Sequence, residues 1–115
     1  MSPLLVAALE EARSLAPARG WSLPSEPTIR EAQRLLDLVM QDWRAPAVQA
    51  EPSGAISLEW EVGAHGWLKL TVAGNATLEH GAVIEGDEYA QVEHFGDHLP
   101  DWVKELLRRL LAVGH

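Results

Sequence analysis

Two stretches of strict alternation between Ile56 and Val72 restrict this chain more than any other feature. Apolar side chains occupy every second position in each stretch, and all but one of the intervening side chains are polar or charged. The apolar positions are Ile56, Leu58, Trp60, Val62, Leu68, Leu70 and Val72. A period of two is typical of a strand that buries one face. The short segment 63–66 contains two glycines, so the pattern predicts two antiparallel strands that share one apolar face.

Turn residues divide the following segment into further strands. Ala73-Gly74-Asn75 and Glu85-Gly86-Asp87 contain residues that tolerate positive φ. Strands are therefore predicted over about 56–62, 67–72, 76–84 and 88–95. Segment 47–51 has a weaker pattern and is a candidate fifth strand.

The turns also predict which residues face one another. We expect Val62 opposite Leu68, Val72 opposite Ala76, and Val83 opposite Tyr89. The first two pairings would place Lys69 between Glu61 and Glu79 on the outer face. The third would place His94 on the inner face, diagonal to His80.

Apolar residues at steps of three and four predict three helices, over about 3–15, 27–44 and 100–112. Ser2 and Ser25 suit the caps of the first two helices, and Gly114 suits the end of the third. Segment 16–24 contains Pro17, Gly20 and Pro24 and is expected to be a loop. On the second helix, Glu31 falls on the polar side, three residues before Arg34.

Together these elements predict one α+β domain over residues 1–115. We expect an antiparallel meander of four to five strands, with two N-terminal helices and one C-terminal helix packed on its apolar face. The last helix should cover the strands that contain Leu58 and Leu70.

The charge of the chain is concentrated in the strand region. The net charge is −8 over 115 residues, and between Glu51 and Asp101 ten residues are acidic while Lys69 alone is basic. A protein of this charge is repelled by phosphate backbones, which argues against nucleic-acid binding. The apolar run Leu4–Leu9 is too short to span a membrane and lacks the preceding cations of a signal peptide. A cytoplasmic protein is therefore expected.

The outer face of the sheet is the first candidate site. Glu59, Glu61, Lys69 and Glu79 are predicted to lie on it together with Trp67, and tryptophan is frequent at binding hot spots. An acidic face with an exposed aromatic residue suits a protein partner, and a basic one in particular. The alternatives are a solvated face that only maintains solubility, and a face or strand edge that forms a homodimer.

A second candidate site consists of histidines. His80, His94 and His98 could approach one another at one end of the sheet, as ligands of a metal or a small molecule, with or without an enzymatic activity. Their spacing is no metal signature, and ordinary partly buried histidines explain it equally well. The chain has no cysteine and no recognisable nucleophile or phosphate-binding motif, so no catalytic residue and no cofactor are expected.

The strand Gly54-Ala55-Ile56-Ser57-Leu58-Glu59-Trp60 carries a resemblance as well. Its Gly–x–Ile–x–Leu–x–Trp motif lies between a Pro-rich helix start (Trp21, Pro24, Pro27) and a Leu-Pro helix (Leu99, Pro100). This order resembles a group of small uncharacterised bacterial proteins, although the Trp–Asp–Gly–x–Gly segment of that group is absent at Trp21-Ser22-Leu23. The resemblance implies a bacterial source and an α+β fold, and it implies no activity. The leading hypothesis is thus a non-catalytic interaction or regulatory protein, such as an antitoxin or an immunity protein.

Overall fold

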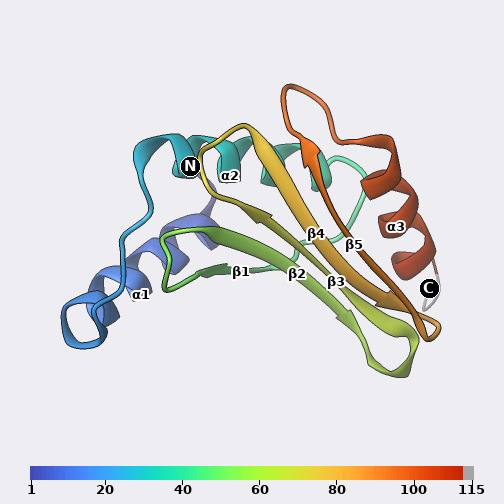
Figure 1. Cartoon of the computed structure of the whole chain (residues 1–115), viewed down its shortest axis with the longest axis horizontal. Coiled ribbons are helices and arrows are strands. Elements are labelled where there is room, and N and C mark those ends of the chain that lie inside the picture. The colour runs from blue at the N-terminus through green and yellow to red at the C-terminus, as the bar shows by residue number, and fades with distance from the viewer. Residues whose placement is uncertain (113–115) are drawn as a thin grey trace.

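The alternating segments form the middle of a five-stranded antiparallel sheet in the computed structural model, which describes residues 1–112 (Figure 1). The strands follow the chain in the order β1-β2-β3-β4-β5. The strands are β1 (Ala47–Ala50), β2 (Ile56–Val62), β3 (Gly66–Val72), β4 (Thr77–Ile84) and β5 (Asp87–His94). The helices are α1 (Pro3–Arg19), α2 (Glu26–Val39) and α3 (Asp101–Leu111), and a 3-10 turn spans Gly63–His65. The predicted α+β meander is confirmed, with the weak fifth strand included.

The helices pack on the apolar face that the alternation predicts. Helix α1 contacts β1, α2 contacts β2 and β3, and α3 contacts β3 and β4. In Figure 1, α2 passes behind the strands. The core contains the alternating apolar residues of β2 and β3 from Ile56 to Val72, and Val62 alone among them is half-buried. Leu35, Leu36, Phe95, Leu106 and Leu107 are buried with them. The opposite face of the sheet carries no helix from residues 1–112, so it is the face available to a partner.

Helix α1 is one turn longer than its sequence suggests. Pro17 was expected to lie in a loop, but the helix continues through it to Arg19. A proline removes only one hydrogen bond there, and Ala16 before it is buried against the core. The helix ends at Gly20, whose N–H bonds the Ala16 carbonyl and whose left-handed backbone lets the Trp21 N–H reach the same carbonyl at 3.3 Å.

Helix α2 is shorter than predicted, and one of its acids is buried. The helix ends at Val39 rather than near Arg44, because residues 40–43 form turns that bring half-buried Trp43 onto the core. Glu31 does not lie on a solvated side with Arg34. Its Oε1 accepts the Gly74 N–H at 2.9 Å and its Oε2 accepts the Ala76 N–H at 2.7 Å.

That contact explains why the β3–β4 register differs from the expected one. The turn docks on α2, where Gly74 approaches so closely that an added Cβ would lie 2.8 Å from the Thr28 hydroxyl oxygen. Ala76 adopts a φ of 59°, and Val72 pairs with Leu78 instead of Ala76. This two-residue shift leaves every side chain on its predicted face but changes its neighbours.

The register between β4 and β5 is shifted by one residue, which is a larger error. Glu85 and Gly86, with φ of 51° and 85°, form a two-residue hairpin that pairs Ile84 with Asp87. Val83 therefore faces Glu88 and not Tyr89. Every side chain of β5 consequently projects from the face opposite to the predicted one.

No helix within residues 1–112 is long and apolar enough to cross a membrane. Gly114, the expected end of the last helix, lies outside the described residues.

Candidate functional site

The open face of the sheet is built from cross-strand rows of side chains. Directly opposed residues of antiparallel strands project from the same face. The ladders align three rows: Glu61, Trp67, Val83 and Glu88; then Glu59, Lys69, Gly81 and Ala90; then Ser57, Thr71, Glu79 and Val92. All five residues expected on the outer face, Glu59, Glu61, Trp67, Lys69 and Glu79, therefore share it.

Trp67 stands in the first row with a carboxylate at each end. Its ring leans over Gly81, where an added Cβ would lie 3.8 Å from two ring carbons, and 39 % of the residue is exposed. A shallow hollow of about 430 Å³ adjoins the ring and is lined in part by Val83, Glu88 and Ala90. Neighbouring strands lie about 4.8 Å apart, so the Glu61 and Glu88 backbones are about 14 Å apart with the indole between them.

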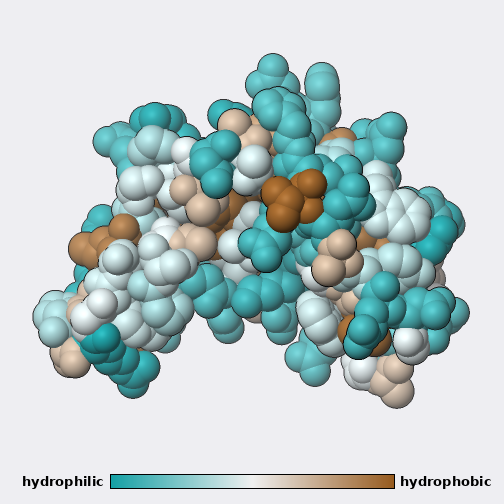
Figure 2. Space-filling view, in the orientation of Figure 1, coloured by the Kyte–Doolittle hydropathy of each residue, from teal (hydrophilic) through white to brown (hydrophobic). Residues whose placement is uncertain are grey.

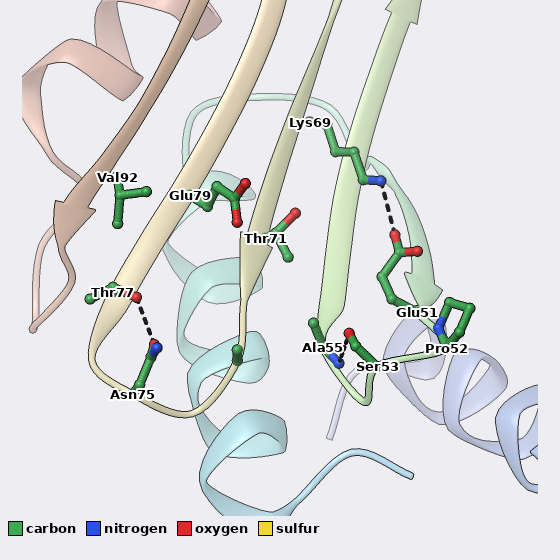
Figure 3. Close-up of a pocket in the computed structure, with 11 residues that line it drawn as sticks. Glu51, Pro52, Ser53, Ala55, Lys69, Thr71, Asn75, Thr77, Glu79 and Val92 are labelled. Atoms are coloured by element: carbon green, nitrogen blue, oxygen red, sulfur yellow. Dashed lines mark hydrogen bonds and ion pairs between the residues drawn. The ribbon is translucent and has the colours of Figure 1, made fainter. Parts of the chain in front are cut away.

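Lys69 does not lie between the two carboxylates expected to flank it. Its Cα neighbours are Glu59 and Gly81, and its Nζ lies 3.0 Å from Oε1 of Glu51, at the end of β1 (Figure 3). The Ser57 hydroxyl donates to the same Glu51 oxygen at 2.7 Å. Lys69 is thus bound to an acid beside the first edge strand.

The contacts of Glu51 lower the pKa of its carboxyl group. Partial burial acts to raise the pKa of Glu51, but the hydrogen bonds from Ser57 and Lys69, together with the charge of Lys69, outweigh it and lower the pKa. Sequence reasoning missed the contact between Glu51 and Lys69. The sequence pattern that could have predicted it is alternation, since positions 47, 49 and 51 alternate with the inward positions of the short first strand and so belong to the outer face.

Four carboxylates of the open face remain uncompensated. Within residues 1–112, no Lys, Arg or His nitrogen lies within 4.0 Å of a carboxylate oxygen of Glu59, Glu61, Glu79 or Glu88, although Arg44 Nη2 donates to the Glu61 backbone carbonyl at 3.4 Å. On the side of the molecule seen in Figure 2 the surface is largely hydrophilic, with only small apolar areas. Charge, rather than a broad apolar patch, is therefore the main property of this face.

A polar hollow of about 660 Å³ crosses the same face, from the β1–β2 turn to β5 (Figure 3). The wall at the β3–β4 turn includes Ala73 and Asn75, whose side-chain oxygen accepts the Thr77 hydroxyl at 2.6 Å. The far end of the hollow is formed by Glu79 and Val92, and Val92 is 60 % exposed. Because Lys69 is held by Glu51, Glu79 is the carboxylate in this hollow that can accept a cation from outside.

The hydroxyl and carboxyl groups of this face differ in their access to solvent. Ser57 is the hydroxyl closest to a carboxylate, but it is 1 % exposed and its proton is directed to Glu51, so it has no access to a substrate. The four carboxylates are spread over β2, β4 and β5, beside hollows that are open to solvent.

The histidines do not form the shared site that their positions suggested. His80 is buried on the inner face, where its Nε2 lies 3.0 Å from Glu93 Oε2, whereas His94 pairs with Thr77 and projects from the outer face. The expectation that His94 shares a face with His80 is wrong, because the β4–β5 register is shifted by one residue. His98 is exposed in the segment before α3. Residues 1–112 contain no group of three or more His, Asp or Glu residues that could hold a metal ion.

Comparison with models of known families, with curated proteins and with solved structures gives no match to this chain.

Proposed function

We propose that this protein is a non-catalytic interaction or regulatory protein whose open sheet face binds a basic segment of a protein partner. The observation that carries the proposal is the row in which exposed Trp67 lies between Glu61 and Glu88, whose carboxylates form no ion pair within residues 1–112. An arginine or lysine placed over the indole would gain a cation–π contact and could reach one of these carboxylates.

The polar hollow supports the same chemistry beside the tryptophan. A second cationic side chain of the partner could enter it and reach Glu79, with the apolar part of the chain against Val92. Phosphate-rich partners would be repelled by the four uncompensated carboxylates, so a protein is proposed rather than a nucleic acid. An antitoxin-like or immunity-like role in a bacterial cytoplasm is the setting that we propose for such a face.

The test is reversal of charge on the face, compared with an equal reversal elsewhere. The face variant replaces Glu59, Glu61 and Glu79 by lysine. The control variant replaces Glu10, Glu11 and Asp42, which are exposed on or after the first two helices. Both variants change the net charge by the same amount, so a difference between them reports position and not total charge.

We expect basic proteins of the source cell to be retained by the wild-type protein and the control, and to be released by the face variant and by salt. The retained proteins are then purified and titrated individually, with Trp67→Ala as a further variant. The proposal is wrong if every purified partner binds the face variant as tightly as the wild type.

A further inference from the structure

The outer edge of β5 is an unpaired strand edge in the part of the chain that the structure describes. Hydrogen-bonded and non-hydrogen-bonded residue pairs alternate along an antiparallel ladder. The Phe95 N–H donates to the Ala76 carbonyl at 2.8 Å, and His94 pairs with Thr77. It follows that the backbones of Glu93, Gln91, Tyr89 and Asp87 point toward β4, and those of His94, Val92, Ala90 and Glu88 point away from the sheet.

No backbone hydrogen bond within residues 1–112 uses this outward set. Glu88, Ala90, Val92 and His94 are all exposed, and their side chains lie on the open face of the sheet. At the other edge of the sheet, β1 is in contact with α1. The β5 edge is therefore one at which a further strand can be added to the sheet.

The inner side of β5 is fixed in place. Glu93 binds His80 at 3.0 Å, and Tyr89 packs edge-on against Trp102, with ring centres 5.7 Å apart. A strand that other contacts already hold in place loses little conformational freedom when a partner strand pairs with it.

The charge of β5 determines which kind of strand can pair with its outer edge. Asp87, Glu88 and Glu93 are its charged residues, with no lysine or arginine. Two β5 strands in contact would bring six carboxylates together, three from each copy, so a second copy of this chain fits poorly. We propose that a basic, extended segment of a partner protein pairs antiparallel with β5 and extends the sheet.

This inference rests on the proposed function, because it takes the partner of the acidic face to be a basic protein segment. It specifies where on the sheet the partner segment binds and which residue types of that segment lie opposite the residues of β5. Across an antiparallel pair, directly opposed residues share a face. Lysine or arginine is expected opposite Glu93, Glu88 and Asp87, and small or β-branched apolar residues are expected opposite Val92 and Ala90.

The pattern defines a probe, the blocked peptide Thr-Lys-Val-Thr-Val-Thr-Lys-Lys. Its two valines would face Val92 and Ala90, and their N–H groups would bond the outward carbonyls of β5. We expect binding at low salt, and slower hydrogen exchange at the amides of Glu88, Ala90 and Val92. N-methylation of the two valines should weaken binding by about tenfold, since two backbone hydrogen bonds are lost. N-methylation of the threonine after each valine should have little effect.

The matched protein variants are Ala90→Pro and Ala90→Val. The Ala90 N–H points away from β4, so proline removes an outward donor without breaking the ladder, and valine keeps the donor. Ala90→Pro should weaken peptide binding by about tenfold at an unchanged melting temperature, and Ala90→Val should not weaken it.

Equal peptide affinity for Ala90→Pro and Ala90→Val would overturn the strand-addition proposal. So would concentration-dependent dimerisation of the wild-type protein that Ala90→Pro abolishes, because the edge would then belong to a second copy. A partner that binds Ala90→Pro normally but is released by the Glu59, Glu61 and Glu79 reversals would leave the proposed function standing without the edge.

Discussion

Glu31 should contribute more to stability than any other exposed or buried acid of this chain. It is 93 % buried on α2, and its two carboxylate oxygens accept two different backbone N–H groups of the β3–β4 turn, at 2.9 and 2.7 Å. That turn supplies Ala73 and Asn75 to the polar hollow. The buried acid thus connects a helix on one face of the sheet to a wall of the candidate site on the other.

The cleanest perturbation is Glu31→Gln, because glutamine has nearly the same shape but only one acceptor oxygen. One N–H would keep a neutral hydrogen bond, and the other would face an NH₂ group. A hydrogen bond to a charged group is worth about 1.5–3 kcal/mol, and an unsatisfied donor costs about 1–3 kcal/mol. Ala76 is exposed, so water relieves part of this cost. We therefore expect a loss of about 2 kcal/mol, or about 8 °C in Tm for a chain of this length.

Urea denaturation at pH 7 measures this loss directly. Glu26→Gln on the same helix is the matched control, since the Glu26 side chain is 84 % exposed and lies 3.9 Å from Arg30. It should change the free energy of unfolding by less than about 0.5 kcal/mol. If Glu31→Gln costs no more than Glu26→Gln, the two hydrogen bonds to the turn do not stabilise the fold as argued.

Two further predictions concern the core and the ion pair of the open face. Leu58→Asp places a charge at a fully buried position, so it should cost about 4 kcal/mol or more and abolish the cooperative melting transition seen by circular dichroism, whereas Leu23→Asp at a 53 % exposed position should melt like the wild type. Glu51→Gln should lower the free energy of unfolding by about 1 kcal/mol at pH 7, since its contacts are partly screened by water. Because the pKa of Glu51 is lowered in the folded state, its contribution is complete above the unfolded value of about 4.3 and is lost as the pH falls from there through the folded pKa. A stability loss of Glu51→Gln that does not shrink as the pH is lowered below the unfolded value would contradict this reasoning.

The strands and the faces of β2, β3 and β4 could be predicted because alternation needs only the local sequence. The neighbours of each side chain could not, because they depend on turn lengths that are set elsewhere. Glu31, on α2, helps to fix the β3–β4 turn, so the contact between Lys69 and Glu79 expected from a shorter turn does not form. The periodic pattern of the strand residues cannot predict a contact that a helix residue such as Glu31 makes with a turn between strands.

An error in the predicted register moves side chains to the other face of the sheet only when the strand is shifted by an odd number of residues. The shifts at the β2–β3 and β3–β4 turns are two residues each, so the candidate face kept its five residues although their pairs changed. The shift at β4–β5 is one residue, because Glu85 takes a positive φ that glutamate rarely adopts. That single residue moved His94 away from His80, and it placed Glu88 and Val92 on the open face, where the sequence had not located them.

The corrected register also supports the proposed binding face over a face that only keeps the protein soluble. Solubility requires charge, but it does not require an exposed indole, or a glycine beneath it that leaves room for the ring. Trp67 lies over Gly81 and between two acids whose carboxylates form no ion pair within residues 1–112, while Lys69 is held by Glu51. A face with its own cation already bound has negative charge left for another molecule, and its aromatic residue marks where a cation would be held.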